Sequence, residues 1–573
     1  MRAAAALAAA SLLLAALGLA AAVPTPLAVR ADTVILNADV HTVDDHLRRV
    51  TAVAIRDGRI LAVGSNLAIR EYVGSKTRQI DAKGQTVLPG FVDSHIHLRS
   101  GSGLATGVDL SEILQKSEWL RLIAEKVATL PKGQWLLGGA WDHNLDDGIL
   151  PDRTLLDAVA PEHPVLLRDI DAHSAWANSR AIELAGIRAN SPVPPGGVIL
   201  LDDAGEPNGI FLEGAMGLFN DAPGMREATD IQTGLEAAAQ LANRYGITTV
   251  HDMSGVTEAF IALAREGDLS LRVWQGAFAN PRLDTSANEQ LVRLAAERQR
   301  IADTMAAIEL PAHAGPLFEL GFIKIAVDGV LSTRTAFMAE PYADAADEVG
   351  EPFMTENQLE QLVRASVAQA FPVAIHAIGD AAVAMVLDVY AKHPPQPDVP
   401  AHRVEHIEVV RPDAFKRFER LGVSASMQPH HATCCVGNYV IDRIGPERMP
   451  YAYPWQSFIK QEVPLLLSAD WPTSPLNPLV QIADAMERKT SLDGELATWD
   501  SGQTLRFEDA LLGYTRLGAE HTSWRDSIGS IAPGRWADLV LLDRRLDIRS
   551  PEAVRAATVQ ETLLGGTTVY RRP

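Results

Sequence analysis

Residues 87–97, which read VLPGFVDSHIH, decide the fold of this chain. The stretch begins as an apolar strand and ends in two histidines with one residue between them. Side chains at positions i and i+2 of a strand lie on the same face, so His95 and His97 can point toward one centre. Imidazole is the commonest protein ligand of divalent transition metals. On this motif alone, a metal site and two incidental histidines both stay open.

The middle of the chain alternates between apolar strand-like runs and amphipathic helical patterns. Eight strand-like runs occur, at residues 87–93, 247–251, 271–277, 321–327, 372–376, 403–407, 423–427 and 463–468. Helical patterns, such as those at residues 232–245, 357–370 and 380–392, lie between several of them. This alternation predicts an α/β fold with a parallel sheet, and eight strands predict a TIM-like (β/α)₈ barrel with its active site at the C-terminal strand ends.

Both ends of the chain are rich in short strands and tight turns. Residues 32–88 and 521–573 show this pattern on either side of the barrel region at residues 89–520. We therefore expect one small β-sandwich domain built from both termini. Residues from about 100 to 235 are too many for one crossover and indicate an insertion after the first barrel strand. The insertion either lies over the barrel mouth and closes on a substrate, or stabilises the fold from the side.

The composition limits the partners of the protein. The formal net charge is −21, and because a phosphate backbone requires a basic surface, we expect no nucleic-acid partner. Residues 1–22 contain one arginine followed mainly by Ala, Leu and Gly, which is typical of a secretory signal peptide. We expect cleavage and a secreted or periplasmic bacterial protein without a stable membrane span; the alternative is an uncleaved membrane anchor. The sequence leaves open whether two chains form a homodimer.

Four further polar residues lie within or at the end of predicted barrel strands: Lys324, His376, His406 and Asp470. Taken singly, each is explained by an ordinary polar contact, which for Lys324 is an ion pair with Asp328. Together with His95 and His97, they place six potential ligands at strand ends that converge in a barrel, which indicates a metal site. Cys434 and Cys435 are adjacent and form no zinc-type cluster, so nitrogen and oxygen must hold the metal.

These residues, in this order, resemble the amidohydrolase superfamily, and in particular amidohydrolase family 3, with its YtcJ-like and N-substituted formamide deformylase-like members. The motifs that carry the resemblance are residues 87–97, 324–329 with Arg334, 376–380, 470–472 and, in the insertion, 171–179. The resemblance covers nearly all of residues 32–573. It implies that His95, His97 and Asp470 hold one metal ion, that His376 and His406 hold a second, and that a carboxylated Lys324 bridges the two ions.

The same resemblance implies a metal-dependent hydrolase. In this superfamily the metal activates water and polarises the scissile carbonyl, and Asp470 would carry the proton of that water to the leaving amine. Nitrogen and oxygen ligands fit Zn²⁺ best, without excluding manganese, iron or cobalt. A one-metal variant would leave Lys324 uncarboxylated and could omit His406.

Five residues are candidates for contacting the substrate: Trp141, His143, His173, Arg334 and His430. His430 and its neighbour His431 follow the seventh strand and lie at the expected barrel mouth, and of the two we choose His430. The alternative for Trp141 and His143 is that they pack within the insertion and do not contact the substrate. Because no basic cluster points to a phosphorylated substrate, we expect a small-molecule amide: an N-acyl or N-formyl amine, or a cyclic amide. The alternatives are an esterase, lactonase or carbamate hydrolase that uses the same site, or a non-catalytic regulator that acts by binding.

Overall fold

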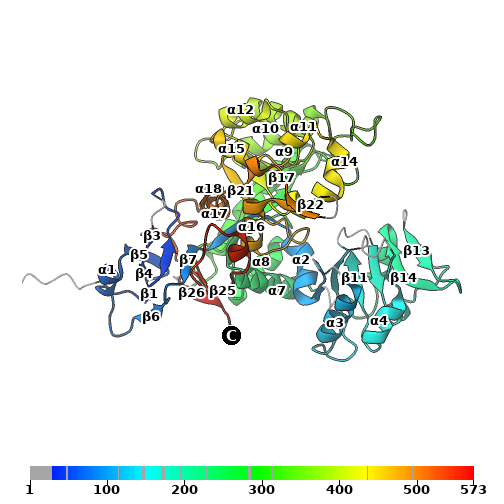
Figure 1. Cartoon of the computed structure of the whole chain (residues 1–573), viewed down its shortest axis with the longest axis horizontal. Helices are drawn as coiled ribbons and strands as arrows, with labels where there is room; N and C mark the ends of the chain where they lie inside the picture. Colours follow the sequence, from blue (N-terminus) through cyan, green and yellow to red (C-terminus); the bar gives the residue numbers. More distant parts are fainter. Residues whose placement is uncertain are drawn as a thin grey trace, which may run out of the picture.

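The protein has three parts: a central barrel, a β domain and an inserted subdomain (Figure 1). The computed structural model describes residues 29–46, 49–111, 113, 115–142, 149–169, 174–193, 197–225, 230–281, 285–311, 314–434, 436–492 and 495–573. The expected signal peptide at residues 1–22 lies outside these described residues. None of the described helices combines the length and the apolarity that a membrane span requires.

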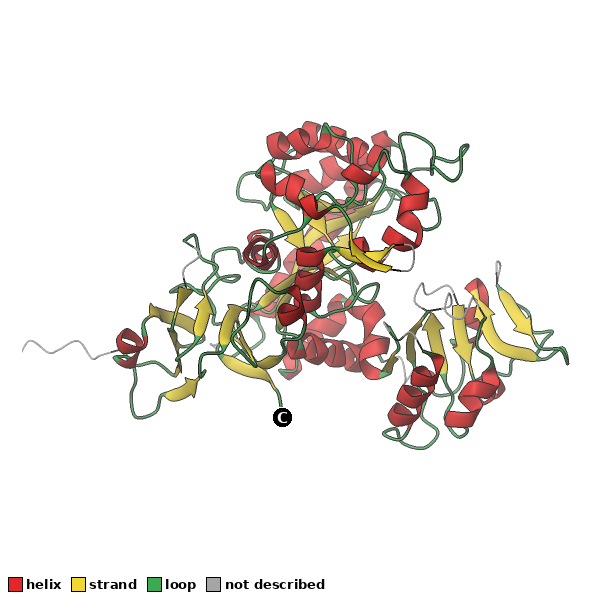
Figure 2. Ribbon diagram, in the orientation of Figure 1, coloured by secondary structure: helices red, strands yellow, loops and turns green. Residues whose placement is uncertain are grey.

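Eight parallel strands form the barrel sheet, in the spatial order β8-β15-β16-β17-β18-β19-β20-β21. Their bounds are β8 (Phe91–Ile96), β15 (Ile247–Asp252), β16 (Arg272–Phe278), β17 (Phe318–Ala326), β18 (Val373–Ala377), β19 (Arg403–His406), β20 (Ser424–Met427) and β21 (Leu465–Leu467). Helices gather around this sheet (Figure 2), including α7 (Ile231–Arg244), α8 (Thr257–Glu266), α9 (Ala287–Ala306), α10 (Glu356–Ala368), α11 (Asp380–Lys392), α12 (Ala414–Leu421) and α16 (Pro478–Glu487). The predicted (β/α)₈ barrel is confirmed.

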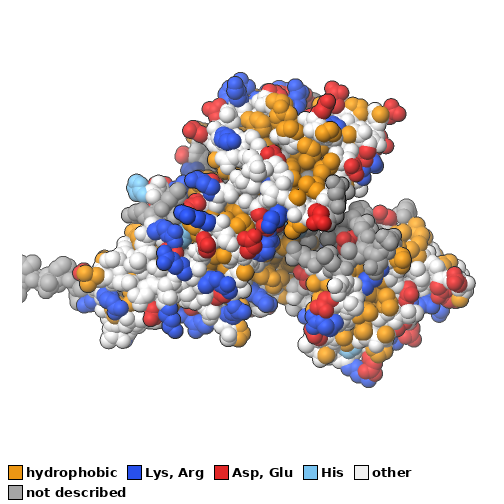
Figure 3. All heavy atoms as spheres, in the orientation of Figure 1, with side chains coloured by type: hydrophobic (Ala, Val, Ile, Leu, Met, Phe, Trp, Pro, Cys, Tyr) orange, Lys and Arg blue, Asp and Glu red, His pale blue; other side chains and the backbone are white. Residues whose placement is uncertain are grey.

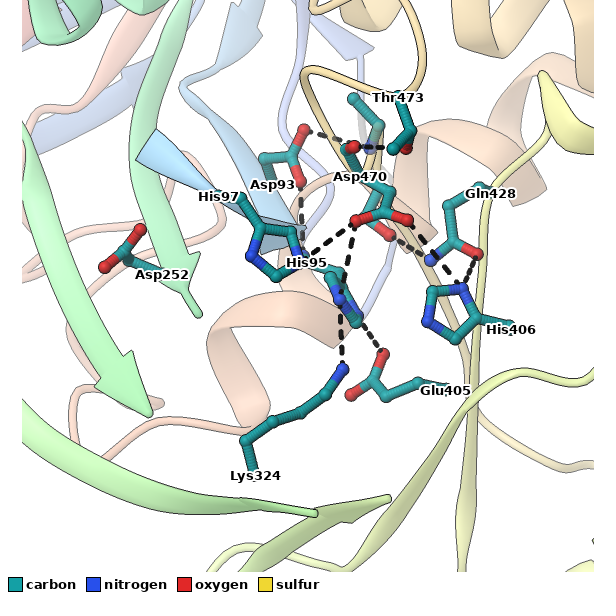
Figure 4. A network of polar contacts seen from close by, with 12 residues as sticks. Asp93, His95, His97, Asp252, Lys324, Glu405, His406, Gln428, Asp470 and Thr473 are labelled. Atoms are coloured by element: carbon teal, nitrogen blue, oxygen red, sulfur yellow. Dashed lines mark hydrogen bonds and ion pairs between the residues drawn. The ribbon is translucent and has the colours of Figure 1, made fainter. Parts of the chain in front are cut away.

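Hydrogen bonds between the first barrel strand and the segment after the last one close the ring. The backbone N–H of Asp470 donates to the carbonyl of His95 at 2.9 Å. The N–H of Ala469 donates to Oδ2 of Asp93 at 3.1 Å, so a buried side chain takes part in the closure. These contacts bring two ends of a barrel some 375 residues apart in sequence to one place (Figure 4).

The β domain contains strands from both termini, as predicted. One sheet has the order β5-β4-β1-β6, and a second has the order β26-β25-β24-β7-β2-β3. From the N-terminal side come β1 (Thr33–Leu36), β2 (Asp39–His41), β3 (Arg49–Val50), β4 (Ala52–Arg56), β5 (Arg59–Gly64), β6 (Arg78–Asp81) and β7 (Thr86–Pro89). The C-terminal side supplies β24 (Leu539–Leu542), β25 (Val559–Leu564) and β26 (Thr567–Arg571).

The chain passes from the β domain into the barrel at Gly90. β7 ends at Pro89 within the β-domain sheet, and β8 begins at Phe91 within the barrel. The single strand predicted at residues 87–93 was therefore wrong, because this run divides between two sheets. A Cβ atom at Gly90 would lie 2.2 Å from Oγ1 of the buried Thr248, so only glycine fits beside β15 at this crossing.

The inserted subdomain follows α2 (Leu98–Thr106), which packs on α7. Its sheet has the order β13-β14-β12-β11-β10-β9, and the strands are β9 (Val108–Asp109), β10 (Gly138–Trp141), β11 (Leu166–Asp169), β12 (Ser174–Ala177), β13 (Val198–Leu201) and β14 (Pro207–Leu212). Trp119 on α3 (Lys116–Val127), Trp141 and Trp176 form its core, with ring centroids 6.2 to 6.5 Å apart. In Figure 1 the subdomain stands to one side of the barrel.

Charges of both signs are interspersed on the molecular face shown in Figure 3. Hydrophobic side chains form separate patches there rather than one continuous surface.

We predict that Gly90→Ala lowers the free energy of unfolding by about 1–3 kcal/mol, because the added methyl group must displace the side chain of Thr248. Denaturant unfolding monitored by circular dichroism measures this change. Gly103→Ala is the matched control, since a Cβ atom at Gly103 of α2 meets nothing within 4 Å and alanine favours a helix. Equal stability of the two variants would contradict the prediction.

Candidate metal centre

The C-terminal ends of the barrel strands bring the predicted ligands together (Figure 4). His95 lies near the end of β8, and His97 directly follows this strand. Lys324 comes from β17 and His406 from the end of β19. Asp470 follows β21 and lies at the centre of the group in Figure 4, with the rings of the histidines around it.

The carboxylate of Asp470 faces two groups of imidazoles. Its Oδ1 lies 3.5 Å from Nε2 of His95 and 3.4 Å from Nε2 of His97. Its Oδ2 lies 4.0 Å from Nδ1 of His406 and 4.0 Å from Nε2 of His431. Each group of three offers ligand atoms that all lie within 4.8 Å of one another, so each can hold a metal ion. Asp470 is shared by both groups.

The chemistry of the first group fits a cation. Among the described residues, the buried Oδ1 of Asp470 has no hydrogen-bond donor. Burial lowers the pKa of both His95 and His97, so these rings are neutral near pH 7. A neutral imidazole nitrogen and a carboxylate oxygen that face each other with lone pairs are stabilised by a positive ion between them. The residues therefore fit a divalent metal.

Lys324 contacts a metal ligand rather than an aspartate. Its Nζ lies 3.1 Å from Nε2 of His95, and burial lowers the pKa of Lys324 to about 8. The ion pair with Asp328 that the sequence suggested is wrong, because the carboxylate of Asp328 accepts the backbone N–H groups of Phe337, Ile378 and Gly379 at 2.9 to 3.0 Å. A buried amine with a lowered pKa is partly neutral at physiological pH and can react as a nucleophile.

His376 and His406 lie beside each other, with ring centroids 4.5 Å apart. Nε2 of His376 lies 3.1 Å from the carbonyl oxygen of Gly329, and Nδ1 of His406 lies 2.9 Å from Oε1 of Gln428. His376 is near the centre but belongs to neither of the two groups of three described above. Its predicted role as a ligand stays a prediction.

Sequence reasoning favoured His430 over its neighbour, but the structure places His431 beside the centre. The ring of His431 stacks on that of His406, with centroids 6.1 Å apart and an interplanar angle of 9°. His430 instead places Nδ1 at 2.8 Å from Oδ2 of Asp484. The signal in the sequence was a pair of adjacent histidines after the seventh strand, and only the backbone direction decides which ring faces Asp470.

Glu405 is a residue of the candidate centre that sequence reasoning missed. It is fully buried, and its Oε2 lies 2.8 Å from Nδ1 of His95. Its Oε1 lies 2.6 Å from Nε of Arg403. Burial opposes ionisation of Glu405, but the charges of Arg403 and Lys324 outweigh it and lower the pKa of this carboxyl. The anionic carboxylate accepts the Nδ1–H of His95 and thereby leaves Nε2 to face Asp470.

The remaining candidates for substrate contact lie in different surroundings. The indole of Trp141 is fully buried in the inserted subdomain and donates to the carbonyl of Leu167 at 3.0 Å, which supports the packing role instead of substrate contact. His143 and His173 lie outside the described residues. Arg334, in the loop after β17, pairs with Asp344 at 2.8 Å, and its contact with a substrate stays a prediction.

Two residues of the centre have a backbone conformation that residues other than glycine rarely adopt. The φ angle is +57° at Asp470 and +74° at His406. Such residues cost about 1–3 kcal/mol each and cluster at functional sites, where the surrounding structure holds them in place. The hydrogen bond from the N–H of Asp470 to the carbonyl of His95 is one such constraint.

A parallel barrel with histidines and an aspartate converging at its C-terminal strand ends defines a metal-dependent hydrolase. The family model described as "Amidohydrolase family" matches residues 78–570. The chain therefore belongs to the amidohydrolase family, and the predicted resemblance is confirmed.

Two curated relatives and one solved structure illustrate this membership. Putative amidohydrolase YtcJ of Bacillus subtilis is 31% identical over 93% of this chain and 98% of its own length. N-substituted formamide deformylase of Arthrobacter pascens is 28% identical over 94% of this chain and 98% of its own length. An uncharacterized metal-dependent hydrolase from Pyrococcus horikoshii has a TM-score of 0.67 and 26% identity, covering 90% of this chain and 98% of that chain.

We predict that Glu405→Gln lowers metal affinity about 10- to 100-fold, because the carboxylate that orients His95 and increases its basicity is lost. Competition with a chromogenic chelator measures this affinity. Glu561→Gln is the matched control, since Glu561 is also a buried carboxylate with arginine partners but lies in the β domain. An unchanged affinity in a folded Glu405→Gln protein would contradict the role given to Glu405.

Proposed function

We propose that this amidohydrolase-family member hydrolyses the C–N bond of a small amide: an N-acyl or N-formyl amine, or a cyclic amide. The observation that carries the proposal is the buried Asp470 carboxylate, with one unpartnered oxygen facing His95 and His97. The similarity to a relative named as a formamide deformylase supports a C–N bond as the target. The alternative, an ester, lactone or carbamate, would use the same residues.

The ion is proposed to lie between His95, His97 and Asp470, with His406 and His431 on the other side of the same carboxylate. Nitrogen and oxygen donors favour Zn²⁺ among the common biological metals. When bound, such a metal lowers the pKa of water and polarises the scissile carbonyl. The protein supplies a fixed set of ligands for it, because Glu405 and Gln428 each contact the Nδ1 atom of a ligand histidine.

Asp470 is proposed to move the proton. Its Oδ1 faces His95 and His97, where the ion is proposed to lie, so the other oxygen, Oδ2, can accept a proton from the attacking water. The same oxygen can then give this proton to the nitrogen of the departing amine. The positive φ angle and the backbone hydrogen bond to His95 fix the carboxylate for both transfers.

Lys324 is proposed to carry an N6-carboxylate. Its neutral amine forms a bond to the carbon of CO₂, a C=O electron pair moves onto oxygen, and nitrogen releases one proton to solvent, so a neutral amine becomes an anionic carbamate. This change offsets the positive charge that a divalent ion brings next to His95, 3.1 Å from Nζ.

Export of the protein from a bacterial cell remains a proposal that rests on residues 1–22 alone.

His97→Ala tests the proposed function. We expect this variant to keep its circular dichroism spectrum but to lose bound metal, and more than about 100-fold of its activity on a panel of amides and esters. Inductively coupled plasma mass spectrometry measures the metal. Wild-type protein that contains no metal and turns over no amide or ester would favour a binding protein, and turnover of esters alone would favour the esterase alternative.

Lys324→Ala tests the bridging carboxylate. We expect loss of activity and of about half the bound metal where two ions are present, with partial rescue by formate, acetate or propionate. These acids can occupy the space of the lost side chain and supply the missing anion. Unchanged metal content without rescue would indicate one ion and an unmodified lysine.

A further inference from the structure

Phe278 is an aromatic residue at the end of β16 that remains exposed to solvent. Its side chain is 53% exposed. In the parallel ladder between β16 and β17, Phe278 is the register partner of Lys324, whose Nζ reaches the metal centre. Register partners in adjacent strands have their side chains on the same face of the sheet. Phe278 and Lys324 therefore lie side by side on the face that lines the barrel.

The packing of the preceding residues supports this placement. Trp274, four residues before Phe278, packs with Phe322 in a cluster inside the barrel. Ala277 instead belongs to the core formed with the outer helices. Since side chains alternate along a strand, Trp274 and Phe278 share the inner face. Trp274 is buried, whereas Phe278, four residues closer to the C-terminal end of the same strand, is exposed.

The exposed apolar side chains near β17 extend this surface. Among the described residues, Phe278 and Phe353 are the two exposed phenylalanines. The backbone N–H of Phe353 donates to the carbonyl of Val327, which directly follows β17. Val330 is 39% exposed and follows Gly329, whose carbonyl contacts His376. Val330 and Phe353 are thus exposed apolar residues of, or bonded to, the segment that follows β17, the strand paired with β16.

We propose that Phe278 contacts the substrate and that the substrate carries an aromatic or aliphatic group adjacent to the scissile bond. This inference rests on the proposed function, because the same centre must hold the reacting carbonyl. An apolar group placed there removes the phenyl ring of Phe278 from water, which is the usual way in which a pocket selects a ligand. A substrate with a small or charged group at this position leaves the ring exposed and binds more weakly.

Two hydroxamic acids test the inference without turnover. Acetohydroxamate and benzohydroxamate share a head group that binds metals and differ in the apolar group beside it. We expect benzohydroxamate to bind metal-loaded wild-type protein about tenfold more tightly by isothermal titration calorimetry. Phe278→Ala should reduce this ratio to about twofold, whereas Leu67→Ala, which removes an exposed leucine of the β domain, should keep it.

Equal affinity for the two hydroxamates in wild-type protein would overturn the inference, as would an unchanged ratio in Phe278→Ala. The affinity for acetohydroxamate reports on the metal centre itself and shows whether the variant still contains it. Benzyl- and methyl-substituted amides provide the second readout, and Phe278→Ala should lower kcat/KM more for the benzyl compounds. A hydroxamate preference without hydrolysis of any amide would contradict the proposed function and leave the role of Phe278 intact.

Discussion

The closure of the barrel between its first and last strands is the constraint on which the rest of the structure depends. The N–H of Asp470 bonds to the carbonyl of His95, and the N–H of Ala469 bonds to the carboxylate of Asp93. Without these bonds, the predicted ligands at residues 95 and 97 and the carboxylate at residue 470 would belong to separate edges of an open sheet. Closure of the barrel brings Oδ1 of Asp470 to 3.5 Å from Nε2 of His95 and 3.4 Å from Nε2 of His97.

Charged side chains are buried close together, beneath the hydrogen bonds that close the barrel. Arg403 and Glu405 are a buried cation and a buried anion, and the buried side chains of Lys324 and Asp470 belong to the same centre. Each would be costly alone, but the geometry pairs Arg403 with Glu405 at 2.6 Å and places Glu405 against His95. The network therefore fixes the orientation of a ligand before a metal arrives, which reduces the reorganisation that binding requires.

The sequence predicted the barrel and both halves of the β domain, because apolar periodicity is a local signal. Strand-end position also identified residues that the barrel gathers at one end, and their roles as ligands stay predictions. Prediction from the sequence failed where the outcome depends on the direction of the backbone or of a side chain in the folded protein. Residues 87–93 carry one uninterrupted strand pattern, yet the chain changes sheets at Gly90. Nothing local distinguishes His430 from His431, and Glu405 attracted no attention because its partner, His95, comes from a strand 310 residues earlier. Phe278 looks like an ordinary strand residue until its register with Lys324 is known.

The attachment of the inserted subdomain has a mechanical consequence. α2 starts immediately after His97, and it joins the barrel strand that carries the ligands to the sheet of the subdomain. The same helix packs closely around Trp471, since any Cβ atom at Gly101 would collide with its ring. α2 therefore links the subdomain to His97 on one side and to the neighbour of Asp470 on the other, so a change in the position of this helix would shift both.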